Sequence, residues 1–123
     1  MRRFLTLSAI NGFVAIALGA FAAHGLSGRL SPRMLQVFET GAEYQMTQGL
    51  ALLGVAILTN QWPQSRALKI SGWAFVLGLI LFPFSLYLLA LTGLGWLGAI
   101  TPLGGLGFLV GWVALAVFAF KQV

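Results

Sequence analysis

Four long apolar runs constrain this chain more than any other feature of its sequence. They cover residues 4–24, 42–59, 68–91 and 101–120 of the 123. A helix of about 20 apolar residues crosses the roughly 30 Å hydrocarbon core of a bilayer. Only 7% of the residues are charged, whereas soluble domains carry about 25%. The sequence therefore predicts a single all-α domain, an integral membrane four-helix bundle.

The cations predict the orientation of these spans. The first run follows two arginines, as a secretory signal does, but it exceeds the 7 to 15 apolar residues of a signal core, so we expect a retained span. With the N-terminus in the cytoplasm, the outer side holds only Arg29 and Arg33. Because cytoplasmic loops are richer in Lys and Arg, both termini are expected in the cytoplasm, with the chain in the cell inner membrane. The inner side then holds Arg2, Arg3, Arg66, Lys69 and Lys121.

The segment before the second span has a different character. Ser31 and Pro32 form a typical helix start, an N-cap hydroxyl followed by proline. Residues 32–42 then place apolar and polar side chains on opposite sides of a helix. We expect a short amphipathic interfacial segment here, with a bend at Gly41 before the chain enters the membrane.

Small residues mark the faces by which the helices are expected to pack. Gly12 and Gly19 lie on a stripe of small residues in the first helix, and Gly107 and Gly111 form a G-x-x-x-G spacing in the last. Such faces allow close approach of helices in lipid. Pro83 predicts a kink in the third helix, and Thr101 followed by Pro102 predicts the start of the fourth.

Polar residues gather in the predicted outer half of the membrane. Glu43 has the highest free-energy cost of burial in lipid among them, because its side chain is ionisable. It is therefore either a functional residue or a carboxylate held by a donor such as Tyr87, Arg29 or the start of the last helix. Asn11 is expected to form an interhelical hydrogen bond. The candidate polar cluster or ligand-binding set is Glu43, Gln48, His24, Tyr44, Tyr87, Gln45, Ser85 and Thr101.

Several chemistries do not fit the composition. Cysteine is absent and there is one histidine, so thiolate sites and a bis-histidine haem within one subunit are excluded. His24, Glu39 and Glu43 match no recognised metal-ligand spacing. The net charge of +5 comes from cations at the ends of apolar runs, which form no basic face for nucleic acid. We expect no catalytic residue, no metal and no cofactor.

Four motifs in order carry a family resemblance. They are G-A-F-A-A-H-G-L from Gly19, T-G-A-E-Y-Q-M from Thr40, S-L-Y-L-L-A-L-T-G from Ser85 and T-P-L-G-G from Thr101. Together they resemble the YgdD-like family of small four-span membrane proteins, which also has small vertebrate transmembrane relatives. The resemblance implies a multi-pass inner-membrane protein of unknown function. The chain departs from that pattern at Gln48, where relatives have histidine.

Two classes of function remain open. A structural or accessory membrane protein needs only the packing faces and the outer polar cluster. The alternative is a small homo-oligomeric transporter or proton-coupled carrier that uses Glu43, although the inner half offers no polar path. An enzyme is not expected. The lipid bilayer is the predicted partner, a homo-oligomer stays open, and the sequence identifies no small-molecule ligand.

Overall fold

The computed structural model describes residues 1–122, and its long elements are all helices. They are α1 (Arg2–Phe21), α2 (Pro32–Gln61), α3 (Arg66–Thr92) and α4 (Thr101–Gln122). A short π-helix, η1 (Ala22–Leu26), extends α1, and a 3₁₀-helix, η2 (Gly95–Ala99), precedes α4. The all-α prediction is confirmed.

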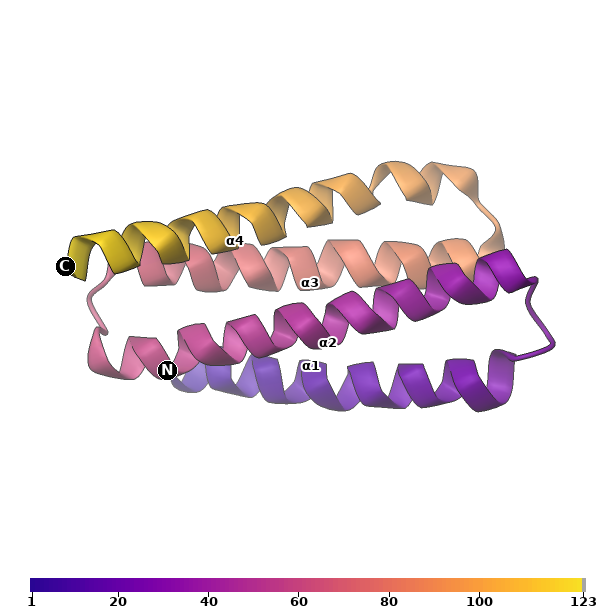
Figure 1. Ribbon diagram of the computed structural model, residues 1–123, viewed down its shortest axis with the longest axis horizontal. Coiled ribbons are helices and arrows are strands. Elements are labelled where there is room, and N and C mark those ends of the chain that lie inside the picture. The colour runs from indigo at the N-terminus through magenta and orange to yellow at the C-terminus, as the bar shows by residue number, and fades with distance from the viewer. Residues whose placement is uncertain (123) are drawn as a thin grey trace.

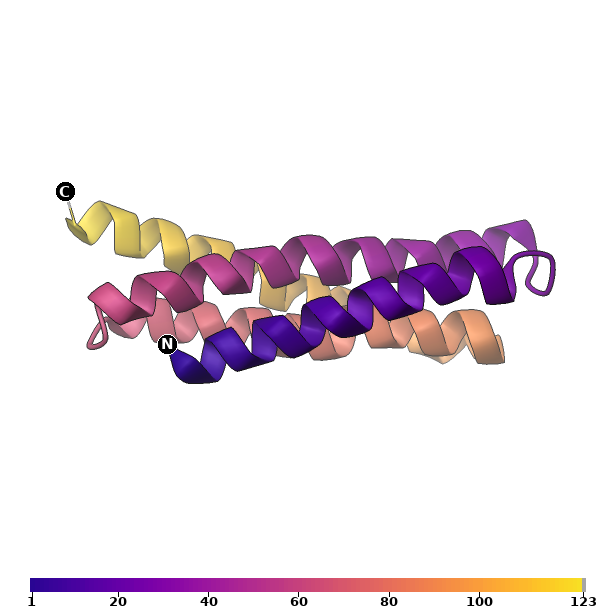
Figure 2. The ribbon, with the colours of Figure 1, turned by 90° about the horizontal axis from the view of Figure 1, so that it is seen from below.

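Consecutive helices run antiparallel and pack side by side (Figure 1, Figure 2). The extensive interfaces are those of α1 with α2, α2 with α3, and α3 with α4. The helices α2 and α3 therefore form a central pair, with α1 and α4 on opposite sides of it (Figure 1). Both termini lie at one end of the bundle, which we call the terminal end; the opposite end is the far end.

The interior contains two apolar clusters, while large apolar side chains also cover the outside. One cluster fills the half next to the terminal end around Phe4, Leu52 and Phe75, and the other fills the far half around Phe38 and Tyr87. Outside, 77% of Phe13, 64% of Leu109 and 83% of Phe120 are exposed, along with many other apolar side chains. Apolar exposure on this scale marks a surface that meets lipid or a partner.

The helix α2 differs from the prediction for its first part. It is one continuous helix of 30 residues with Gly41 inside it, so residues 32–42 do not form a separate helix, and the interfacial segment is not confirmed. Phe38, only 1% exposed, packs with Ala22, Leu26 and Tyr87 in the far cluster. The amphipathic face expected to meet the membrane surface is thus buried against η1 and α3. The expected Ser31 cap is present, because its Oγ accepts the backbone N–H of Met34 at 3.2 Å.

The glycines of α4 form its contact with α3. A Cβ on Gly107 would lie 3.1 Å from the main-chain oxygen of Ala74 and 3.1 Å from the nitrogen of Gly78, and one on Gly111 would lie 2.8 Å from the Phe75 ring. The Ser71 hydroxyl donates to the Gly111 carbonyl oxygen at 2.7 Å. Because Gly107 and Gly111 have no side chains, the backbones of α3 and α4 come into contact, as in close-packed membrane helices.

The helix α1 uses a different set of small residues from the predicted stripe. A Cβ on Gly12 would meet nothing within 4 Å, and one on Gly19 would meet only the Ala42 Cβ, at 3.9 Å. The buried positions are Ser8, Ala15 and Ala22. Their seven-residue spacing keeps one line of contact facing α2, which corrects the placement of Gly12.

The helix α3 runs through Pro83 without interruption and ends at Gly93, whose φ of 73° is left-handed. Glycine adopts that conformation at no steric penalty, so it stops the helix there. Three of the four long segments are long and apolar enough to cross a membrane: Arg2–Leu26, Arg66–Thr92 and Gly95–Gln122. The fourth segment, α2, carries more polar side chains, and their positions define the candidate site.

Candidate functional site

Gln45 joins three helices near the middle of the bundle. Its side chain is 1% exposed, and its Oε1 accepts the hydroxyl of Tyr87 from α3 at 2.5 Å. Its backbone carbonyl oxygen accepts the Asn11 side-chain amide from α1 at 2.8 Å. Asn11, Gln45 and Tyr87 therefore form a polar latch, which we call the Gln45 latch, across α1, α2 and α3.

Two glycines, each one turn from Gln45, make room for this latch. A Cβ on Gly41 would lie 2.9 Å from the Tyr87 ring, and a Cβ on Gly49 would clash with the Asn11 amide. The pattern G-x-x-x-Q-x-x-x-G in α2 thus places both partners beside the glutamine. Larger residues at either glycine would push α3 or α1 away from the bonding distance.

Further polar pairs connect α4 to the central helices. The Trp112 indole N–H donates to Gln48 Oε1 at 2.9 Å, which ties α4 to α2. Ser85 Oγ lies 2.6 Å from Thr101 Oγ1, which ties α3 to the start of α4. The Thr101 hydroxyl therefore pairs across the interface at the predicted helix start.

Glu43 and His24 lie apart from these pairs, and both are exposed. Tyr87 and Thr101, two donors expected to hold Glu43, are hydrogen-bonded to Gln45 and Ser85 instead. The reason is the rotation of α2 about its axis, which directs Gln45 toward α3 and leaves Glu43, two positions earlier, on the outside. The expectation that a donor in the bundle holds Glu43 is corrected accordingly.

The predicted polar cluster is thus divided by the fold. The Gln45–Tyr87 and Ser85–Thr101 pairs are brought together, while Tyr44 is exposed with its ring 5.0 Å from that of Phe82. Sequence reasoning missed Trp112 as the partner of Gln48. The glycines around Gln45 were the signal that could have placed Asn11 beside it.

The chemistry open to these groups is limited by their pairing. Within residues 1–122, every buried side-chain nitrogen or oxygen has a hydrogen-bond partner. Over the same residues, no group of three His, Cys, Asp or Glu side chains is placed to hold a metal ion. A ligand that used the Gln45 latch would have to break bonds between helices. The arrangement favours holding the helices together over binding a polar molecule.

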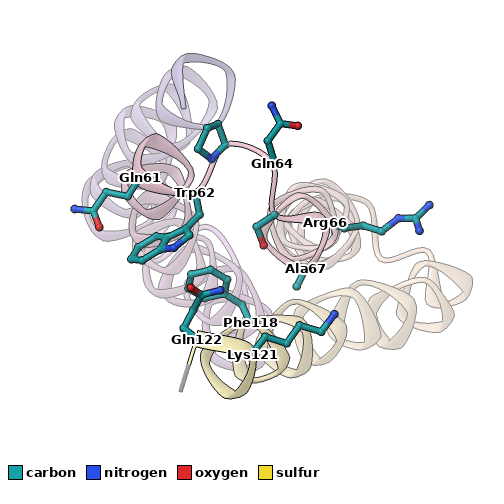
Figure 3. Close-up of a pocket in the computed structure, with 10 residues that line it drawn as sticks. Gln61, Trp62, Gln64, Arg66, Ala67, Phe118, Lys121 and Gln122 are labelled. Carbon is teal, nitrogen blue, oxygen red and sulfur yellow. The ribbon is translucent and has the colours of Figure 1, made fainter.

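A hollow of about 400 Å³ opens at the terminal end of the bundle (Figure 3). Trp62 and Phe118 form its apolar wall, with ring centroids 5.2 Å apart. Arg66 extends away from these two rings, so the polar groups at its rim do not converge on one point (Figure 3). We therefore assign no ligand to this hollow.

Comparison with known proteins identifies the family. A family model described as "Protein of unknown function (DUF423)" matches residues 18–105. The chain belongs to the DUF423 family. The match covers the end of α1, all of α2 and α3, every connection between the long helices and the start of α4, and so includes Gln45, Tyr87 and Thr101. The YgdD-like name stays an expectation, whereas membership of a membrane family of unknown function is confirmed.

Relatives of this DUF423 protein match along nearly its whole length. It is 43% identical over 123 residues to the UPF0382 membrane protein YwdK of Bacillus subtilis, covering 100% of both chains. It is 44% identical over 120 residues to a UPF0382 membrane protein of Haemophilus influenzae, covering 98% of this chain and 95% of the relative. No solved structure matches the chain. The names of these relatives place them in a membrane and state no activity.

Proposed function

We propose that this DUF423 protein is a four-span structural or accessory protein of the cell inner membrane. The observation that carries the proposal is the pairing of its interior polar groups with one another. Asn11, Gln45, Tyr87 and Ser71 all bond across helix interfaces. In lipid, where apolar side chains gain little by leaving the acyl chains, such bonds and close packing hold helices together.

We also propose that α2 spans the membrane, in addition to the other three long helices, despite its polar residues. It lies between α1 and α3 along its length (Figure 1), and its 30 residues correspond to about 45 Å of helix. Its most deeply buried polar side chain, Gln45, is paired inside the bundle. About 20 residues counted back from Leu58 reach Glu39, so Glu43 lies roughly 6 Å inside the outer edge of the hydrocarbon core.

The orientation follows from the ends of the bundle. Arg3, Arg66 and Lys69 lie at or near the beginnings of α1 and α3, and Lys121 lies at the end of α4. These positions belong to the terminal end (Figure 1). The excess of cations there supports a cytoplasmic location for both termini.

The carrier alternative requires a partner chain. Glu43 is exposed on the outside of α2, so a single chain provides no enclosed path past it. A second copy packed on this face of α2 would be needed to enclose the carboxylate and to shield it from lipid. Only that arrangement would make Glu43 a proton-binding residue inside a protein.

Proton flux in reconstituted vesicles separates the two functions. The purified chain, placed in liposomes that contain a pH-sensitive dye, should dissipate an imposed pH gradient no faster than empty liposomes. The Glu43→Gln variant should give the same rate. Flux through the parent chain that disappears in Glu43→Gln would overturn the structural proposal and support the carrier. Vesicles with gramicidin provide the positive control for the dye.

A further inference from the structure

Two adjacent hollows lie between α1 and α3, and we call them together the groove. Its wide part, about 880 Å³, opens at the terminal end and is lined by both helices. A smaller hollow of about 170 Å³, which we call the narrow part, lies nearer the middle of the bundle. Leu7 and Val76 line both hollows, so the two lie next to each other along α1 and α3.

The wide part of the groove is strongly cationic. Arg2, Arg3 and Lys69 all line it. The guanidinium carbon of Arg3 lies 5.8 Å from the centre of the Trp73 ring, a cation–π contact that fixes its position. The acidic side chains of the chain, Glu39 and Glu43, belong to the far half of α2 and cannot neutralise these cations. Among the residues that line this mouth, an anion would therefore meet three cationic side chains and no carboxylate.

Beyond this mouth the lining is mostly apolar, and its polar members, Asn11 and Gln45, belong to the Gln45 latch. Leu7, Ile10 and Val14 face it from α1, and Val76, Leu79 and Ile80 face it from α3. The path from Arg3 to Val14 spans 11 residues of helix, which correspond to about 16 Å. Half of a hydrocarbon core is roughly 15 Å, so the groove is as long as one acyl chain in one leaflet.

We propose that this groove binds an anionic diacyl phospholipid, with its phosphate at Arg2, Arg3 and Lys69 and one acyl chain along α1 and α3. The cations distinguish this occupant from a neutral lipid, and the apolar path distinguishes it from free phosphate. Basic pockets between membrane helices on the cytoplasmic side are known to suit anionic headgroups. The lipid site depends on insertion of the chain in a membrane, but it does not depend on whether the protein is a structural protein or a carrier.

Lipid retention by the purified full-length chain tests the proposal. The chain in detergent is mixed with equal amounts of phosphatidylglycerol and phosphatidylcholine, and bound lipid is measured by native mass spectrometry. The parent should retain phosphatidylglycerol preferentially. Arg3→Gln with Lys69→Gln should weaken its binding roughly tenfold to thirtyfold, since each cation contributes a factor of several. Arg3→Lys with Lys69→Arg should restore it.

Matched controls separate the site from general charge and from folding. Arg66→Gln with Lys121→Gln removes two cations at the same end but outside the groove, and should change binding less than threefold. Ile80→Trp should block the narrow part, whereas Leu77→Trp, at an exposed position that does not line the groove, should not. Glycerol phosphate, which has no acyl chain, should fail to compete.

Three results would overturn the proposal. They are equal retention of phosphatidylcholine, equal loss with both pairs of cation variants, and full competition by glycerol phosphate. Each of these leaves the proton-flux measurement unaffected, so failure of the lipid site is distinguishable from failure of the proposed function.

Discussion

Removing the Tyr87 hydroxyl tests the Gln45 latch most simply. Tyr87 is 4% exposed and Gln45 is 1% exposed, and the bond between them is 2.5 Å long. Tyr87→Phe keeps the ring against Phe38 and Gly41 but leaves the Gln45 amide oxygen without its donor. Interhelical bonds in membranes contribute about 0.6 kcal/mol on average and up to about 1.7, and an unpaired buried acceptor costs about 1 to 3. We expect a loss of about 1 to 2 kcal/mol.

The assay is reversible unfolding of the purified chain in mixed detergent micelles, followed by circular dichroism. Tyr44→Phe is the matched control, because Tyr44 is exposed and its ring packs on Phe82; it should change the free energy of unfolding by less than about 0.5 kcal/mol. Gln45→Leu and the double variant complete a cycle whose coupling energy should be about 0.6 to 1.7 kcal/mol. Equal stability of Tyr87→Phe and Tyr44→Phe, with zero coupling, would refute the latch.

Three further predictions use the same unfolding measurement. Gly107→Leu should lower the free energy of unfolding by about 1 to 3 kcal/mol or more, because the leucine side chain would meet the main chain of α3. Gly19→Leu should lower it less, and Gly12→Leu should leave it almost unchanged. An inverted order would mean that the interfaces are misassigned. Trp112→Phe should cost about 0.6 kcal/mol, less than Tyr87→Phe, because its bond to Gln48 is exposed; a larger loss would contradict that ranking. Glu43→Gln should change the free energy of unfolding by less than about 0.5 kcal/mol, since the side chain is exposed outside the bundle, and a larger loss would place the carboxylate in a bonded site.

The helical elements were predictable because length and apolar content decide them. Runs such as residues 68–91 admit a helix and little else in lipid, where the backbone must satisfy its own hydrogen bonds. The small residues Gly107 and Gly111 were also identifiable, because their spacing creates a flat face. These features depend on local sequence and on the solvent.

Contacts between helices were harder to predict. Periodicity places Gly12 and Gly19 on one stripe, but the crossing of α1 over α2 decides which of them is covered. The position of Glu43 in α2 suggested a bonded carboxylate, whereas the rotation of α2 directs Gln45 inward instead. Phe38 was assigned to an interfacial segment because nothing local shows that η1 and α3 extend far enough to bury it. Such outcomes depend on the rotation and length of neighbouring helices.

The central claim is tested most directly by measuring on which side of the membrane each end of α2 lies. The chain has no cysteine, so single cysteines report position without background. Ser27→Cys lies in the turn before α2, and Gln64→Cys lies in the turn after it; Gln64 is chosen because Ser65 caps α3. In intact spheroplasts a membrane-impermeant maleimide should label Ser27→Cys at once and Gln64→Cys only after permeabilisation. Labelling of both from the same side would show that α2 does not cross the membrane and would contradict the four-span account.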